Sequence, residues 1–348
     1  MFNALTRTAN AQAANFPFCT IEPNTGEVAV PDARLEKLAA IAKSAQIVPA
    51  KISFVDIAGL VKGASKGEGL GNQFLANIRE CDAIAYVLRC FDDPNIIHVA
   101  NKVDPIADAE VVETELMLAD LESLEKRRTG VEKKAKGGDK DARLTLDLID
   151  RALLLLREGK SARLVTRSAD EEKAFGELQL LTSKPALYVC NVDEASAATG
   201  NDMSRRVEDY ARQHDAAVIV ISAEIESQLA QLPDGEQREY LATLGLEEPG
   251  LNRLIRQAYQ LLGLQTYFTA GPKEARAWTI HKGDKAPQAA GVIHTDFERG
   301  FIRAQTIAYD DYVALGGEVA AKEAGKARDE GKDYVVKDGD VMLFKFNT

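Results

Sequence analysis

The sequence is poor in cysteine, and the few cysteines that it has are dispersed. Four occur among 348 residues, and no two of them have Cys-x-x-Cys spacing. This pattern indicates neither a zinc site nor a disulfide framework, and free thiols are typical of a reducing compartment. Cys19 stands beside Thr20, and we favour a semi-buried loop cysteine there over a redox-active one.

Long apolar runs and an excess of positive charge are also missing. No stretch approaches the run of about 20 apolar residues that a membrane-spanning helix needs, and the opening Met-Phe-Asn-Ala-Leu-Thr-Arg lacks the apolar segment of a secretory signal. We therefore expect a cytoplasmic protein. The net charge of −11 argues against broad, nonspecific binding to nucleic acid or anionic lipid, but it leaves room for a local basic patch.

Four short apolar runs are present, each followed by polar or glycine-rich residues. Their near-continuous hydrophobicity is typical of parallel strands that are covered on both faces. A chain of this length can form two or three domains with buried cores. We therefore predict an α/β domain whose strands include residues 52–55, 83–88, 186–190 and 217–221.

Two other regions have a different pattern. Residues 107–135 and 140–158 show helical periodicity and are separated by Gly137-Gly138-Asp139, which predicts an antiparallel helical hairpin inserted into the α/β domain. From about Leu264 onward, runs at 275–280 and 341–346 alternate as half-buried strands do, and residues 320–330 resemble a polar helix. This pattern predicts a small α+β C-terminal domain.

The segment that begins at Asp56 carries the first chemical motif. Asp56 ends a predicted strand and Gly59 follows three residues later, which matches the Asp-x-x-Gly element of P-loop switch proteins. The carboxylate would hold the magnesium shell, and the glycine amide could approach a terminal phosphate because no Cβ intervenes. By itself the motif is short, and a simple strand-ending turn remains the alternative interpretation.

Two further motifs follow the next predicted strands and support the first. Asn191-Val192-Asp193-Glu194 and Ser222-Ala223-Glu224 occupy the places of the Asn-Lys-x-Asp and Ser-Ala-Lys elements that hold the base in the GTPase superfamily. Val192 replaces the lysine, and Glu194 replaces the aspartate that accepts the paired N–H donors of guanine. Strict recognition of guanine should therefore be weakened.

A second segment, Asn101–Asp104, matches Asn-Lys-x-Asp letter for letter, but its surroundings do not fit. A loop-like sequence precedes it, Pro105 follows at once, and no Ser-Ala element lies suitably downstream. We therefore assign Asn101–Asp104 to a surface loop or a helix entry.

With these elements in order, the chain resembles the YchF subfamily of Obg-like ATPases over essentially its whole length. The motifs that carry the resemblance are residues 15–24, 56–72, 135–139, 263–271 and 338–341. The resemblance implies an α/β fold with a P-loop NTPase, G-domain-like parallel sheet, an inserted helical hairpin and a C-terminal TGS domain of the β-grasp type. It places the G-type nucleotide-binding domain at 1–112 and 184–262, the helical (coiled-coil) domain at 113–183 and the TGS domain at 263–346. It also implies ATP preferred over GTP, magnesium as cofactor, and association with ribosomes.

The resemblance assigns roles to individual residues. Thr20 matches the switch I threonine that would bind magnesium together with Asp56. Nucleotide-binding roles fall on Gly59, Asn191, Val192, Glu194, Ser222 and Ala223.

Hydrolysis needs another residue, because Leu60 stands where many GTPases have a water-positioning glutamine. His98 matches a family histidine implicated in hydrolysis, and we hypothesise that its imidazole positions or deprotonates the attacking water. The alternative is a loop histidine at the surface.

Family members begin with a strand and a loop of the form Gly-x-x-x-x-Gly-Lys-Ser/Thr, which this sequence does not contain. It starts instead at residues that resemble the helix after that loop, with Met1 where the family usually has leucine. Either translation was assigned to begin too late, or the short chain is genuine and lacks a central strand. We favour the first, because every other element of the nucleotide site remains and strand loss would leave two strands unpaired. An upstream, in-frame phosphate-binding loop or stop codon distinguishes them.

The turn of the predicted hairpin is locally basic. Lys133, Lys134 and Lys136 belong to a group of positive residues around Gly137. They would contact the phosphate backbone of ribosomal RNA, although a solvated, lysine-rich helix end is the alternative.

Two functions are compatible with these patterns. We expect a ribosome-associated ATPase that cycles between nucleotide states and is impaired in the chain as it stands. The alternative is a catalytically inactive interaction protein that acts through the TGS and helical domains. Nucleotide binding by the purified protein separates the two.

Overall fold

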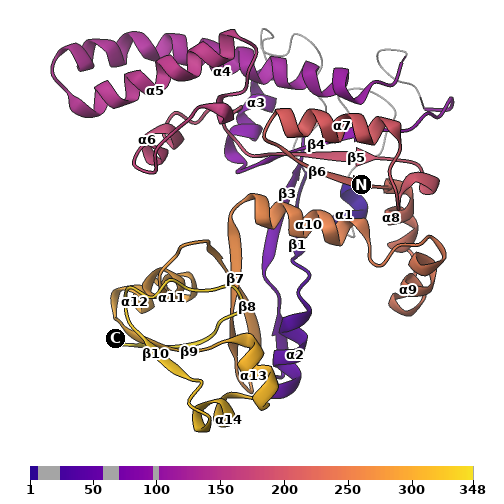
Figure 1. The fold of residues 1–348 in the computed structure, drawn as a ribbon, viewed down its shortest axis with the longest axis vertical. Helices are drawn as coiled ribbons and strands as arrows, with labels where there is room; N and C mark the ends of the chain where they lie inside the picture. Colours follow the sequence, from indigo (N-terminus) through magenta and orange to yellow (C-terminus); the bar gives the residue numbers. More distant parts are fainter. Residues whose placement is uncertain (7–23, 58–69, 97–101, 348) are drawn as a thin grey trace. The chain divides into compact units, whose positions relative to one another are not determined.

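The computed structural model describes residues 1–6, 24–57, 70–96 and 102–347 (Figure 1). The chain forms two compact units. The first contains Met1–Gly26 and Val55–Leu254, and the second contains Glu27–Phe54 and Ile255–Thr348.

The centre of the first unit is a parallel sheet of three strands in the order β4-β5-β6. β4 spans Ile84–Arg89, β5 spans Ala186–Asn191 and β6 spans Ala217–Ile221. In β5 the first five residues are buried, as expected of a central strand that is covered on both faces. The strands predicted from three of the apolar runs are confirmed.

A separate two-stranded sheet pairs β1 (Asn24–Ala29) with β3 (Lys51–Asp56), which confirms the fourth predicted strand. Both strands cross the division between the two units. Among the described strands, β3 pairs only with β1, and β4 pairs only with β5. The second edge of β3 and that of β4 therefore have no strand partner within the described residues.

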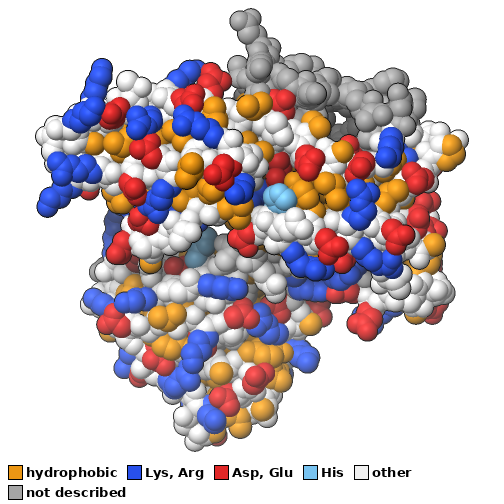
Figure 2. Space-filling model, turned by 45° about the horizontal axis from the view of Figure 1, so that its top comes forward, with side chains coloured by type: hydrophobic (Ala, Val, Ile, Leu, Met, Phe, Trp, Pro, Cys, Tyr) orange, Lys and Arg blue, Asp and Glu red, His pale blue; other side chains and the backbone are white. Residues whose placement is uncertain are grey.

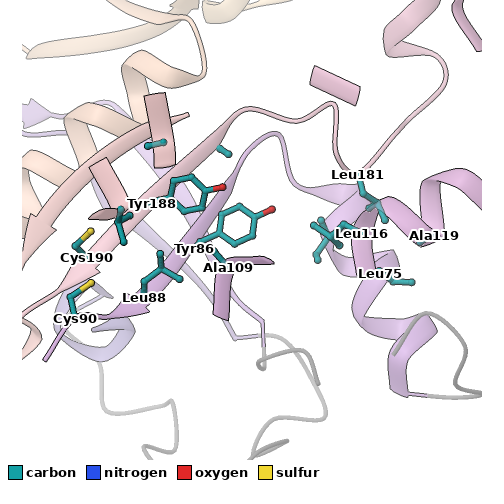
Figure 3. Packing of buried hydrophobic residues seen from close by; sticks show 14 of the residues in the cluster. Leu75, Tyr86, Leu88, Cys90, Ala109, Leu116, Ala119, Leu181, Tyr188 and Cys190 are labelled. Carbon is teal, nitrogen blue, oxygen red and sulfur yellow. The ribbon is translucent and has the colours of Figure 1, made fainter. Parts of the chain in front are cut away.

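Helices and a buried aromatic cluster complete the core beside this sheet. Figure 3 shows Tyr86 of β4 next to Tyr188 of β5, with ring centroids 5.2 Å apart. Residues of α3 (Leu70–Glu80) and α7 (Asp202–Gln213) pack into the same cluster. This unit also contains α1 (Phe2–Thr6), α8 (Ala223–Leu229), α9 (Asp234–Thr243) and the short helices η2 (Ala162–Leu164), α6 (Glu172–Gly176) and η3 (Glu194–Ser196). The helix α10 (Gly250–Leu261) begins in this unit and ends in the second.

The predicted helical hairpin is confirmed as α4 (Pro105–Lys136) and α5 (Lys140–Arg157), drawn side by side in Figure 1. Asp104 caps α4 by accepting the backbone N–H groups of residues 106 and 107, and Pro105 occupies the first turn, where a missing N–H costs nothing. The Asn101–Asp104 segment thus ends in a helix entry, one of the two expected interpretations. Gly138 has a φ of 97°, which makes the turn between the helices possible.

Buried polar groups fasten this hairpin to the sheet. The Asp120 carboxylate of α4 accepts hydrogen bonds from the Leu181 N–H, the Thr182 N–H and the Thr182 hydroxyl at 2.7–2.8 Å. Farther back on α4, Glu113 accepts from the Tyr188 hydroxyl at 2.8 Å and from the Arg163 guanidinium at 2.5 Å. The Arg163 and Glu113 side chains are only 6% and 4% exposed, so each needs the other to compensate for lost hydration.

The second unit contains a six-stranded sheet in the order β10-β9-β11-β7-β8-β2. β11 pairs antiparallel with β9 and parallel with β7, and β2 adds in parallel to the outer edge of β8. The bounds are β2 Gln46–Val48, β7 Leu264–Ala270, β8 Glu274–His281, β9 Phe301–Ile307, β10 Arg328–Glu330 and β11 Val341–Phe346. The helices are α2 Ala33–Ala42, α11 Ala286–Ile293, α12 Thr295–Arg299, α13 Tyr309–Leu315 and α14 Glu318–Glu323.

Residues 27–54 belong to this unit through β2 and through an ionic contact at the start of α2. The Arg34 guanidinium binds Asp32 at 2.7 Å and Asp338 at 2.7 Å, and it lies over the Phe268 ring. These two carboxylates raise the pKa of Arg34 above its ordinary value. The sequence does not predict this association, because Arg34 and Asp338 are far apart along the chain.

The prediction of one polar helix over 320–330 is wrong in its second half. α14 ends at Glu323, Gly325 adopts a φ of 69°, and the chain then forms β10 at Arg328–Glu330. A left-handed glycine is a common helix terminator. The register of β10 with β9 shows that tertiary pairing, rather than local propensity, fixes the strand.

Within the described ranges, no helix combines the length and the apolarity that crossing a membrane would require.

The contacts of Asp120 lead to a stability prediction. Asp120→Ala leaves two N–H groups and a hydroxyl buried without an acceptor, so we expect the free energy of unfolding to fall by about 3 kcal/mol. Denaturant unfolding followed by circular dichroism measures this loss. The control Glu125→Ala breaks an exposed pair with Arg157 and should cost less than about 1 kcal/mol. Equal effects of the two variants would contradict the role given to Asp120.

Candidate functional site

The candidate site lies where the parallel strands end. In the register of the sheet, Arg89 of β4 is opposite Asn191 of β5, and Asn191 is opposite Ile221 of β6. Ser222 follows β6 directly. The carboxyl ends of parallel strands share one edge, which is where open α/β sheets bind ligands.

A hydrogen bond joins the two predicted base-recognition motifs at this edge. The Asn191 side-chain oxygen accepts the Ala223 N–H at 2.8 Å, and the Val192 N–H donates to the Ile221 carbonyl at 2.9 Å. Ala223 is the first residue of α8, so its N–H has no acceptor within the helix. Asn191 thus satisfies that donor and holds the start of α8 against the end of β5, while the Val192 side chain is buried.

Ser222 carries an unsatisfied polar group at the same place. It is the N-cap residue of α8, but its side chain makes no capping hydrogen bond. The residue is 2% exposed, and its hydroxyl is buried without a partner in the described part of the chain. A buried hydroxyl without a partner is uncommon in folded proteins.

Glu194 lies on the far side of the first motif, in η3. Asp193 caps η3 by accepting the Ser196 N–H at 2.8 Å. The Glu194 carboxylate accepts a hydrogen bond from the Gln228 amide of α8 at 2.8 Å. The first motif is therefore joined twice to the segment that begins at Ser222: Asn191 binds the Ala223 N–H, and Glu194 binds Gln228 farther along α8.

Asp56 is the last residue of β3, and burial raises the pKa of its carboxyl. α1 packs against α8, the helix that follows Ser222.

Three of the residues assigned from the sequence lie outside the described residues: Thr20, Gly59 and His98. Asp56 is the one proposed magnesium ligand that the structure describes. Magnesium at phosphate sites usually takes one or two protein carboxylates, and the phosphates and water supply the rest. A single half-buried carboxylate fits this pattern, and no larger cluster of metal-binding side chains occurs among the described residues.

Sequence reasoning missed three residues near this site: Gln228, Tyr240 and Arg89. Tyr240 of α9 donates a hydrogen bond to the Gln228 side-chain oxygen. No local motif marks either residue, because their positions depend on how α8 and α9 pack. The Arg89 guanidinium donates to the carbonyls of Phe91, Asp93 and Ile96 and so shapes the chain that follows β4.

Comparison with known proteins places the chain in a family. Over 347 residues it is 56% identical to the "Ribosome-binding ATPase YchF" of Escherichia coli O157:H7, with 100% of this chain and 95% of that protein covered. The chain belongs to the YchF family. The protein of the same name from Bacillus subtilis (strain 168) is 53% identical over 349 residues, with the same coverage.

Two family models match separate parts of this YchF-family chain. A model described as "50S ribosome-binding GTPase" matches residues 1–134, and the YchF-GTPase_C model, described as "Protein of unknown function", matches residues 264–347. The solved structure of the Schizosaccharomyces pombe YchF GTPase superposes with a TM-score of 0.85 at 37% identity and covers 99% of this chain and 93% of that one. The predicted family and fold class are thereby confirmed: an α/β, G-domain-like part is joined to a separate C-terminal domain.

The bond between Asn191 and Ala223 can be tested without any ligand. Asn191→Ala removes the acceptor of the Ala223 N–H, so we expect that amide to exchange with deuterium about fivefold faster, the equivalent of about 1 kcal/mol of lost protection. Asn191→Asp keeps an oxygen at the same place and should preserve the protection. Residue-resolved hydrogen exchange makes the measurement, and unchanged exchange in Asn191→Ala would show that α8 is held by other contacts.

Proposed function

We propose that this YchF-family protein is a cytoplasmic, ribosome-associated ATPase that uses nucleotide hydrolysis as a switch. The observation that carries the proposal is the joining of the Asn191 and Ser222 loops at the carboxyl edge of the sheet, through the hydrogen bond from the Ala223 N–H to the Asn191 side chain. Relatives that share more than half of its residues are named as ribosome-binding ATPases.

The base-recognition residues favour adenine over strict guanine selection. A GTPase uses an aspartate to accept two parallel N–H donors of guanine, and this chain has Glu194, whose carboxylate is already bound by Gln228. Val192 is buried and carries no ammonium group. ATP is therefore the preferred nucleotide in this proposal, and GTP is a weaker one.

In this proposal, hydrolysis depends on the magnesium ligands, on Gly59 and on His98. Asp56 and Thr20 would hold magnesium, which neutralises charge on the phosphates when it is bound. The Gly59 amide would approach the terminal phosphate, and the His98 imidazole would orient the attacking water or take its proton. Asp56 is half-buried, so water would screen its attraction for a cation less than that of an exposed carboxylate.

The topology supports a further strand between β3 and β4. Each of these strands has one edge without a partner among the described strands, and the strand that precedes a phosphate-binding loop would pair with both. We propose that the active protein fills this place with a strand that carries the phosphate-binding loop. The division into a nucleotide-binding domain at 1–112 and 184–262, a helical domain at 113–183 and a TGS domain at 263–346 stays a prediction.

His98 provides the test of hydrolysis. In the protein extended by the upstream strand and loop, His98→Ala should lower ATP turnover by about 100-fold and leave ATP affinity unchanged, because a general base acts in the transition state. Steady-state phosphate release and equilibrium binding measure the two effects.

The control for this variant is Asn95→Ala, an exposed position three residues earlier in the sequence, which should keep full turnover. Normal turnover in His98→Ala would remove the catalytic role. Absence of ATP binding by the extended wild-type protein would favour an interaction protein without catalysis.

The ribosome contact is assigned to the tip of the α4–α5 hairpin. Lys133, Lys134 and Lys136 are exposed in the last turn of α4, and Figure 2 shows Lys and Arg side chains gathered at the end of the hairpin, at the left of the view. Lys136 pairs with Glu132, whereas Lys133 and Lys134 form no ion pair with any described residue. Two free ammonium groups in a protein of net charge −11 can bind RNA phosphates.

Charge reversal tests this contact. Changing Lys133, Lys134 and Lys136 to Glu should reduce co-sedimentation with ribosomes about tenfold, because counterion release on phosphate binding is lost. Wild-type binding should also weaken as salt rises. A matched variant with Lys102, Lys160 and Lys173 changed to Glu carries the same net charge away from the tip and should bind normally. Equal loss in both triple variants would dismiss the tip as the binding surface.

A further inference from the structure

Gln228 bridges the base-recognition loop and α9. Its amide nitrogen donates to the Glu194 carboxylate at 2.8 Å, and its amide oxygen accepts from the Tyr240 hydroxyl. Three segments that are separate in sequence therefore meet in one chain of hydrogen bonds. Glu194 belongs to η3, Gln228 to α8 and Tyr240 to α9.

The orientation of the Gln228 amide follows from its two partners. A carboxylate only accepts hydrogen bonds, so the NH₂ group of the amide must face Glu194. The amide oxygen then faces Tyr240, which has a proton to donate. Burial and the nearby Glu194 and Glu224 carboxylates raise the pKa of the Tyr240 hydroxyl, which keeps it in this donating form.

A small apolar cluster fixes the helices that carry these groups. Ala197, Ile225, Leu229 and Leu241 are buried together, and Tyr240 packs against them. These residues immediately surround the three hydrogen-bonding positions in sequence. The apolar contacts therefore hold the backbones of η3, α8 and α9 in place, and the polar side chains only complete the alignment.

We infer that Gln228 is a specificity-determining positioning residue, which ties the Glu194 carboxylate to α8 and so disfavours guanine relative to adenine. Guanine offers two parallel N–H groups on one edge, and a carboxylate accepts both only when its two oxygens turn together toward the base. With one oxygen bound to Gln228, that rotation costs a hydrogen bond. Adenine lacks the paired donors, so its binding does not require both Glu194 oxygens to turn toward the base. This inference rests on the proposed function, because it concerns which purine the same site selects.

The expected effect is modest, because Gln228 is exposed. A hydrogen bond from a neutral amide to a carboxylate near the surface corresponds to about a three- to fivefold change in an equilibrium constant. Gln228→Ala should therefore raise GTP affinity relative to ATP affinity about three- to fivefold. Gln228→Lys retains a donor toward Glu194 and should keep the wild-type ratio.

The experiment is equilibrium binding of fluorescent ATP and GTP analogues to the complete protein, with magnesium, for the wild type and each variant. Gln231→Ala serves as the matched control, since Gln231 lies just beyond α8 and its amide donates to the Ser227 carbonyl. Because the readout is a ratio of two affinities in one protein, a general loss of stability does not mimic it.

The outcomes separate this inference from the function on which it rests. A shift toward GTP in Gln228→Ala, absent in Gln228→Lys and Gln231→Ala, supports it. An unchanged ratio, or a shift toward ATP, with nucleotide binding intact overturns the role of Gln228 and leaves the ATPase proposal standing. Failure of the wild-type protein to bind either nucleotide overturns both.

Discussion

The candidate site depends on the parallel pairing of β5 with β6. That register places Asn191 opposite Ile221, so that Asn191 reaches the Ala223 N–H at the start of α8. A shift by one residue would turn the side chains of one strand to the opposite face of the sheet and separate the two motifs. The register is in turn held by the buried side chains of β5, which pack on both faces. The position of Asn191 at the end of the sheet therefore depends on the hydrophobic packing of β5.

A second constraint ties the same strand to the helical hairpin. Tyr188 lies three residues before Asn191 on β5 and donates to Glu113 of α4, which also binds Arg163. Separating these groups would leave a buried charge without a partner, at a cost of several kcal/mol. The base of α4 and the strand that leads to the site are thus held as one piece. The basic residues at the other end of α4 are joined to it by a continuous helix.

Much of the fold could be predicted from local patterns. The strands, the hairpin and the alternating strands of the C-terminal domain have the periodicities of their environments, and Asp104 and Pro105 mark a helix start. The exception is instructive. Residues 320–330 read as one helix, but Arg328–Glu330 forms β10 because β9 offers an unpaired edge there. In the site, the motifs predict that the loops at Asn191 and Ser222 lie at one edge of the sheet, whereas Gln228, Tyr240 and Arg89 carry no motif and take positions that packing alone sets.

The sequence by itself determined the family, the order of the elements and the types of residue at the Asp56, Asn191 and Ser222 motifs, because these depend on local periodicity and on short spacings along the chain. The tertiary structure decided which distant groups meet. It joined Asn191 to Ala223, Glu194 to Gln228 and Arg34 to Asp338, and it placed residues 27–54 in the same unit as the C-terminal sheet. Such contacts depend on register and on helix packing, which arise only when the whole core is assembled.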